Sequence, residues 1–170
     1  MEAGAKPPLY TEAQRQRRNE SRWTLVQGIL APVQFVVFLI SLGLVLRFLM
    51  SGQGFEIAAW SVLVKTLLLY TIMVTGSLWE KDVFGQYLFA PAFYWEDWVS
   101  MVVIALHTAY VFAFTFGGLD GRGQMILALF AYFAYVINAG QFLWKLRAAR
   151  LQARDTPELD QRSMHGIATP

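Results

Sequence analysis

Long stretches without a charged residue alternate with short polar segments along this chain. The uncharged stretches are residues 23–46, 66–79, 98–119 and 123–144. About 20 helical residues cross the roughly 30 Å hydrocarbon core of a bilayer, and none of these stretches has the polar stripe of a helix in a water-soluble bundle. The second stretch is too short to span by itself, but it reaches back to Ile57 if Lys65 is tolerated within the helix. The pattern therefore predicts an all-α integral membrane protein with four transmembrane helices, at residues 23–48, 57–79, 98–119 and 123–144.

The composition agrees with this class. Hydrophobic residues make up 56% of the 170 residues and charged residues only 15%, which is typical of membrane proteins rather than of soluble domains. Cysteine is absent, so disulfides and thiolate metal ligands are excluded. The residues before the first span are charged and that span has no small-residue cleavage site, so we do not expect a cleavable signal peptide.

The cationic residues predict how the helices are oriented. They gather before the first span and after the fourth, at Lys6, Arg15, Arg17, Arg18 and Arg22 and at Lys145, Arg147, Arg150, Arg154 and Arg162. The connections at 51–56 and 117–123 contribute only Arg122. By the positive-inside rule both termini are cytoplasmic, and so is the segment 80–97 between the second and third spans. The basic ends thus indicate contact with the lipid bilayer and not with nucleic acid.

Three regions follow from this organisation. Residues 1–22 form a basic cytoplasmic N-terminal segment, in which the capping-box spacing of Thr11 and Gln14 predicts a short helix over 11–22. Residues 23–151 form the transmembrane domain. Residues 152–170 are polar and contain Pro157 without an apolar period, which predicts a disordered tail.

The segment 80–97 is unusual for a connection, because it is neither small-residue rich nor simply polar. Together with Trp79 it holds seven aromatic residues and four carboxylates, the latter at Glu80, Asp82, Glu96 and Asp97. Aromatic side chains at this depth either anchor the protein at the membrane interface or bind a flat apolar molecule. Interfacial anchoring does not explain the acids, which an anionic leaflet repels. Neighbouring carboxyl groups beside apolar rings hold protons more tightly, so this segment is a candidate site for general acid catalysis.

Several polar residues lie within the predicted spans. Gln27, Gln34 and Ser41 are seven residues apart and share one face of the first span, where they either bond neighbouring helices or line a cavity. Lys65 is expected to extend its side chain to the periplasmic interface. Asn138 lies near the cytoplasmic end of the fourth span and is expected to line the same cavity.

His107 lies on the face of the third span that also carries Glu96 and Ser100, about 16 Å deeper than Glu96. Three roles would account for a histidine at this depth: a structural hydrogen bond, ligation of a metal in a bound macrocycle, or proton transfer. No second histidine or cysteine stands near it in the sequence, so we do not expect a protein-bound transition metal.

Five segments of the chain carry a resemblance to a known family. They are Leu9-Tyr10-Thr11, Trp23 to Gly28, Ala31 to Phe35, the block Met73 to Tyr110, and Asn138 to Phe142. From about residue 9 to about residue 151 the sequence resembles the vinyl bacteriochlorophyllide hydratases. The run from Trp79 to Asp97 is long and odd in composition, which makes the resemblance specific.

The resemblance implies a hydro-lyase of bacteriochlorophyll biosynthesis in a bacterial inner membrane, either cytoplasmic or intracytoplasmic photosynthetic, with the active site toward the cytoplasm. Such an enzyme adds water to the C3 vinyl group of chlorophyllide a or of a vinyl bacteriochlorophyllide and gives the 3-(1-hydroxyethyl) derivative. The Mg²⁺ is carried by the substrate, so no cofactor and no protein-bound metal are implied, and other enzymes of the pathway are further candidate partners. The residues leave two alternatives open, a non-catalytic pigment-binding or assembly factor of the photosynthetic membrane and a small multidrug-type transporter.

The roles within the site are our own assignments from the sequence. We assign Glu96 as the general acid, Asp97 as the neighbour that makes Glu96 hold its proton, and Glu80 as the base. The expected pigment-binding residues are four aromatics of the 80–97 segment and three polar residues of the spans, namely Tyr87, Phe89, Tyr94, Trp95, Gln34, His107 and Asn138.

Overall fold

The computed structural model describes the backbone of residues 9–166 and the side chains of residues 9–148. All regular secondary structure in this part of the chain is α-helical, with α1 (Glu12–Glu20), α2 (Arg22–Ser51), α3 (Phe55–Phe84), α4 (Tyr94–Phe116) and α5 (Gly121–Gly166). Four helices are long and apolar enough to cross a membrane: α2, α3, α4 and the Gly121–Ala148 part of α5. The predicted all-α class is confirmed, and four helices have the length and composition expected of the four predicted spans.

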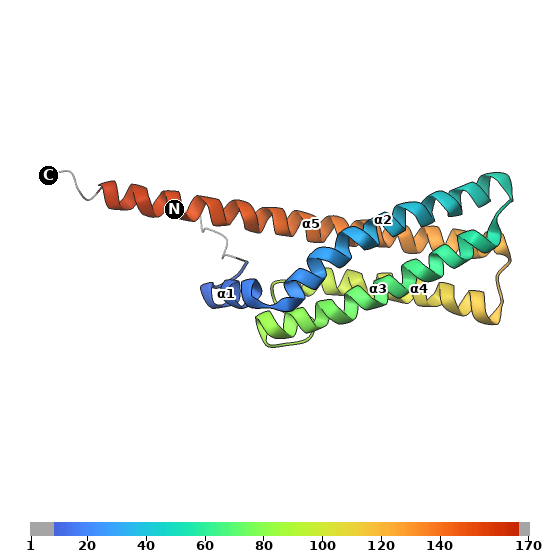
Figure 1. The fold of residues 1–170 in the computed structure, drawn as a ribbon, viewed down its shortest axis with the longest axis horizontal. Coiled ribbons are helices and arrows are strands. Elements are labelled where there is room, and N and C mark those ends of the chain that lie inside the picture. Colours follow the sequence, from blue (N-terminus) through green and yellow to red (C-terminus); the bar gives the residue numbers. More distant parts are fainter. Residues whose placement is uncertain (1–8, 167–170) are drawn as a thin grey trace.

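The four long helices lie side by side in an elongated bundle (Figure 1). The connections from α2 to α3 and from α4 to α5 are at one end, whereas α1 and the α3–α4 connection are at the other (Figure 1). α5 continues past the bundle at that second end (Figure 1). The described chain therefore starts and finishes at the same end of the bundle, as an even number of spans requires.

Local sequence signals explain where the helices begin and end. The side chains of Thr11 and Gln14 cap α1 reciprocally, as the spacing predicted. Ser21 then accepts a hydrogen bond from the backbone N–H of Trp23 and starts α2. Gly85 ends α3 in the left-handed region at a φ of 85°, a conformation that favours glycine. The chain can therefore turn sharply after α3.

The bundle is packed inside and apolar outside. Small residues such as Ala58, Ala59 and Ala128 are fully or almost fully buried between the helices, which allows the backbones to approach closely. Large apolar residues such as Met50, Phe116 and Trp144 face outward and are about four-fifths exposed. A water-soluble bundle would reverse this arrangement, so the outer surface suits lipid.

The structure differs from the sequence prediction at Lys65. This side chain is fully buried rather than extended to the interface, and its Nζ lies 3.6 Å from the centroid of the Tyr135 ring. Aromatic faces attract cations, so a lysine that faces the bundle interior need not reach the membrane surface.

The structure also differs at the C-terminal end, where α5 continues through Gly166 instead of giving way to a disordered tail at residue 152. Polar composition alone does not stop a helix, because Gln, Arg, Leu and Glu are good helix formers. The remainder of that predicted tail, 167–170, lies outside the described residues, as do residues 1–8 of the basic N-terminal segment.

Candidate functional site

Three buried carboxyl groups meet where α3 passes into α4. Glu80 comes from the last two turns of α3, and Glu96 and Asp97 come from the first turn of α4. Their exposed fractions are 5%, 8% and 2%. The fourth acid of the segment, Asp82, is exposed and accepts a hydrogen bond from Ser21 at 2.8 Å. The structure therefore brings together all three acids that the sequence assigned to catalysis.

The connection between the two helices donates backbone hydrogen bonds to this cluster. The N–H of Phe89 donates to Asp97 Oδ2 at 2.7 Å, and the N–H of Ala90 donates to Glu80 Oε2 at 3.3 Å. Phe89 has a φ of 59°, which is uncommon for a residue other than glycine. Successive N–H groups that point the same way form an anion-binding concavity. The strained backbone at Phe89 therefore directs two N–H groups toward the carboxyl groups.

The side chains of Glu80 and Asp97 are hydrogen-bonded to each other. Such a bond requires a proton on one of the two groups, so the pair carries one negative charge rather than two. Asp97 accepts the shorter backbone hydrogen bond and so holds the negative charge better. This difference favours the proton on Glu80.

Glu96 is in a different environment, although it is the sequence neighbour of Asp97. Its Oε2 forms an ion pair with Lys145 Nζ of α5 at 2.6 Å, and this pairing favours the ionised carboxylate. The Lys145 ammonium also lies 5.0 Å from the centroid of the Phe93 ring. The cluster thus combines a proton-holding carboxyl pair with a separate carboxylate. Sequence reasoning assigned Lys145 to topology only, because no local motif links it to an acid 49 residues away.

A buried aromatic cluster supports the carboxyl groups from the side of α1. Phe93 is its centre, and the rings of Trp79, Phe84 and Phe142 lie within 5.8 Å of it, centroid to centroid. Tyr10 stacks on Phe84 at 5.8 Å, and burial raises the pKa of the Tyr10 phenol. These aromatics are therefore part of the protein core and are not free to bind a ligand.

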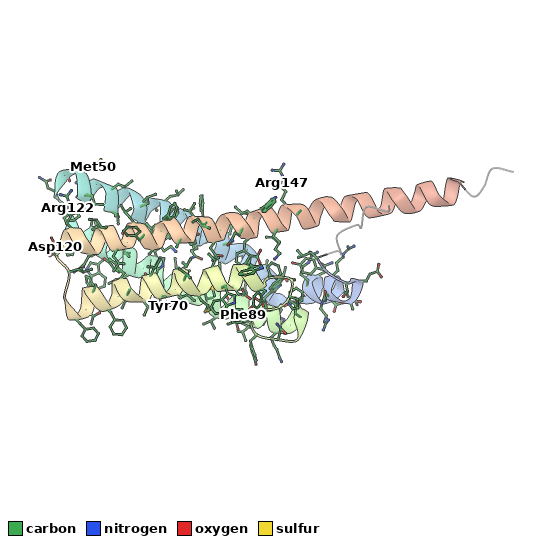
Figure 2. The ribbon with its side chains drawn as sticks, turned by 180° about the vertical axis from the view of Figure 1, so that it is seen from behind. Met50, Tyr70, Phe89, Asp120, Arg122 and Arg147 are labelled. Carbon is green, nitrogen blue, oxygen red and sulfur yellow. The ribbon has the colours of Figure 1, made fainter. Side chains whose placement is uncertain are left out.

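A second set of aromatics in the same region faces outward, and it contains the aromatics that the sequence assigned to pigment binding. Tyr87, Tyr94 and Trp95 are exposed, and Trp95 is 72% exposed. The ring of Phe89 lies 5.8 Å from Tyr94 and 5.5 Å from Trp98. Figure 2 shows Phe89 at the α3–α4 connection. These rings are available to lipid or to a flat ligand.

A groove lies on the outer surface between α3 and α4. It has a volume of about 300 Å³ and is lined by Met73, Val74, Ser77, Leu78, Tyr87, Leu88, Met101 and Ile104. Ser77 is three residues before Glu80, and Met101 is four residues after Asp97. Residues at these spacings are neighbours on a helix surface, so the groove lies next to the carboxyl pair, although neither Glu80 nor Asp97 lines it. Its lining is almost entirely apolar.

The three polar residues assigned to pigment binding are elsewhere, in the interior of the bundle. Gln34, His107 and Asn138 are all at least nine-tenths buried, and none of them lines the groove. The imidazole Nδ1 of His107 is 2.8 Å from the carbonyl oxygen of Val103, and Asn138 Nδ2 donates to Ser100 Oγ at 2.8 Å. Among the described residues no group of three or more His, Cys, Asp or Glu side chains is arranged to hold a metal ion.

Comparison with known proteins gives a consistent result. Residues 10–148 match the protein family described as 2-vinyl bacteriochlorophyllide hydratase. The chain is 65% identical over 149 residues to the 2-vinyl bacteriochlorophyllide hydratase of Rhodobacter capsulatus, covering 88% of this chain and 86% of the relative. It is 68% identical over 143 residues to the protein of the same name from Cereibacter sphaeroides, covering 84% and 89%. No solved structure matches the chain.

Proposed function

The chain belongs to the 2-vinyl bacteriochlorophyllide hydratase family, and we propose that it carries out this hydration at the Glu80–Asp97 pair. The chain is a hydro-lyase of bacteriochlorophyll biosynthesis that adds water to the ring vinyl group (position 2 in the family's name, C3 in the numbering used above). The product is the 3-(1-hydroxyethyl) derivative. This activity is the one that the resemblance implied, and it displaces the non-catalytic pigment-binding alternative.

Hydration of a vinyl group needs a proton donor and a proton acceptor close together. A proton added to the terminal CH₂ leaves a cation on the carbon beside the macrocycle, where conjugation stabilises it. Water then adds its oxygen to that carbon and loses one proton to a base. The reaction consumes one water and no net proton, so the donor must be reprotonated from the base. A cluster of carboxyl groups in different protonation states supplies both functions.

The observation that carries the proposal is the buried carboxyl pair next to the apolar groove. Glu80 holds the shared proton and is the general acid, and Asp97 accepts the hydrogen bond that keeps it in place. Glu96 is ionised by its pairing with Lys145 and is the base that takes the proton from water. The sequence alone suggested the opposite roles for Glu80 and Glu96; the ion pair at 2.6 Å is the reason for exchanging them.

The groove supports a specific placement of the pigment. A flat macrocycle in contact with Met73, Met101 and Ile104 would have its vinyl group directed toward Glu80 and Asp97. The outward rings of Tyr94 and Trp95 would extend this apolar surface at the membrane edge. In this placement the Mg²⁺ belongs to the substrate, and the protein itself requires no cofactor.

We also propose that this end of the bundle faces the cytoplasm. α1 and the region after Trp144 carry the cationic residues Arg15, Arg17, Arg18, Lys145 and Arg147. The opposite end has only Arg47 and Arg122. The positive-inside rule therefore favours a cytoplasmic location for both ends of the chain and for the carboxyl cluster.

The test is to incubate the purified protein, in detergent or in lipid nanodiscs, with chlorophyllide a and no added nucleotide, reductant or metal. We expect the absorption bands of the vinyl-substituted chlorin to be replaced by those of the hydroxyethyl product, and the pigment to gain the mass of one water. If the pigment binds without gaining water and cell extract restores the reaction, the enzyme needs a cofactor, contrary to the proposal. Full hydration by a double variant, Glu80→Gln with Asp97→Asn, would refute the placement of the site.

A further inference from the structure

The interior of the bundle contains polar atoms that the carboxyl cluster does not use. Among the side chains that the structure describes, seven such atoms in the spans are buried without a hydrogen-bond partner. One, Gln124 Oε1, is in the first turn of α5, next to the α4–α5 connection. The other six are Gln34 Nε2, Lys65 Nζ, His107 Nε2, Tyr110 Oη, Asn138 Oδ1 and Gln141 Oε1. They come from all four long helices. An unsatisfied polar group inside a membrane costs several kcal/mol, and buried polar groups with no protein partner are as a rule bonded to ordered water.

The deepest of these groups belong to one polar layer in the middle of the bundle. The rings of His107 and Tyr132 are 6.0 Å apart, and Tyr132 Oη is 2.5 Å from Ser41 Oγ. Ser41 in turn lies 2.7 Å from Ser61 Oγ of α3. Lys65 reaches this layer over the face of Tyr135 at 3.6 Å. Every spanning helix thus contributes a polar side chain at this depth.

A second group of polar residues connects this layer with the carboxyl cluster. Ser100 is one turn below Glu96 on α4, a rise of about 6 Å, and its hydroxyl accepts the hydrogen bond from Asn138. His107 is seven residues further along α4, a rise of about 10 Å. Gln141 of α5 lies between the levels of Lys145 and Asn138. Each gap is short enough for two or three water molecules in series, given hydrogen bonds of about 2.8 Å.

The unpartnered atoms include both donors and acceptors. Lys65 Nζ and Gln34 Nε2 can only donate. Asn138 Oδ1 and Gln141 Oε1 can only accept, and His107 Nε2 accepts when Nδ1–H donates to Val103. An anionic ligand would satisfy only the donors. Water donates and accepts at once, so it can join such groups in a chain.

We propose that these residues, from Gln141 and Asn138 to His107, Lys65, Tyr110 and Gln34, form a hydrated polar column that delivers water to the carboxyl cluster from inside the bundle. The proposal rests on the hydratase activity proposed above. Glu80 and Asp97 are only 5% and 2% exposed, so little of their surface is open to outside water, and a macrocycle in the neighbouring groove would reduce it further. The reaction still consumes one water per turnover. A supply of water from inside the bundle would meet this need without opening the site to the outside.

The first experiment tests for the water itself, without reference to activity. Brief X-ray irradiation of the full-length protein in nanodiscs produces hydroxyl radicals from water, and mass spectrometry locates the oxidised side chains. We expect oxidation at His107, Tyr110 and Tyr132, although all three are at most 2% exposed. Met125 is equally buried but has only a thioether, which is a weak hydrogen-bond acceptor and does not hold water, so this easily oxidised residue should remain unmodified.

The second experiment tests the route. Asn138→Leu replaces the polar link by an apolar side chain of similar size, and we expect about a tenfold fall in kcat for chlorophyllide a with an unchanged KM. Asn138→Ser keeps a hydroxyl and should recover most of the turnover. Thr66→Val is the matched control, since Thr66 is buried beside Lys65 but donates only to the Val62 carbonyl of its own helix; its kcat should equal that of wild type.

Each outcome decides a different point. If His107, Tyr110 and Tyr132 are no more oxidised than Met125 in the wild type, the column is dry and the proposal is wrong, while hydration by the carboxyl cluster is unaffected. If the three residues are oxidised but Asn138→Leu turns over like wild type, the water is present but does not supply the reaction. Absence of hydration by the wild type would instead refute the proposed function.

Discussion

Replacement of Glu80 by glutamine is the most direct perturbation of the carboxyl cluster. The amide has nearly the same shape, and its oxygen can still accept the hydrogen bond from Ala90 while its NH₂ donates to Asp97. The environment is therefore preserved and only the transferable proton is lost. Removal of a general acid typically slows a reaction by about 10²- to 10⁴-fold, which corresponds to about 3–5 kcal/mol in the activation free energy.

The assay follows the decrease over time of the chlorophyllide a absorption band that shifts when the vinyl group is hydrated. The variant and the wild type are compared at equal concentrations of folded protein. Asp82→Asn is the matched control, because Asp82 is a carboxylate of the same helix that is exposed and bonded to Ser21; its rate should stay within about twofold of wild type. We expect kcat of Glu80→Gln to fall by at least about 100-fold with little change in KM. A Glu80→Gln variant that keeps more than a tenth of the wild-type kcat would show that Glu80 is not the acid.

Three further predictions concern the surroundings of the cluster. Lys145→Met leaves Glu96 without its partner and should lower the free energy of unfolding by about 1.5–3 kcal/mol, as measured by denaturant unfolding in detergent; an unchanged value would mean that the ion pair does not stabilise the fold. Trp95→Leu removes an exposed π-face that we expect to contribute about 0.5–1.5 kcal/mol to pigment stacking. The KM of this variant should therefore be about 2- to 13-fold higher. An unchanged KM would favour a role for Trp95 as a membrane anchor. His107→Phe should retain the wild-type preference for Mg-containing pigment over metal-free pheophorbide, because His107 is fully buried away from the groove; a lost preference would demonstrate ligation of the Mg²⁺.

The fold was predictable from the sequence because each span is specified by its own residues. An uncharged run of about 20 residues can satisfy its backbone in lipid only as a helix, and Thr11, Ser21 and Gly85 end or start helices through local hydrogen bonds or glycine conformation. The proximity of Glu80 and Asp97 was also predictable from the sequence. The two acids flank one short connection, so the ends of α3 and α4 had to be adjacent.

The protonation roles that we propose were not predictable, because the argument for them depends on contacts between distant parts of the chain. Lys145 reaches Glu96 across 49 residues, and this ion pair rather than sequence adjacency distinguishes Glu96 from Asp97. Lys65 was misplaced for a similar reason. Its length suggested extension to the interface, but the ring of Tyr135, 70 residues away, provides a partner inside the bundle.

The groove between α3 and α4 lies on the outer surface of the bundle, and its residue Val74 is 62% exposed. A pigment that uses this groove can move between the enzyme and the leaflet by sideways diffusion in two dimensions, without crossing an aqueous phase. The relevant substrate concentration is then the number of pigment molecules per lipid, not per volume of cytoplasm. Rates measured at a fixed total pigment concentration should consequently fall as lipid is added, because extra bilayer dilutes the substrate at the mouth of the groove.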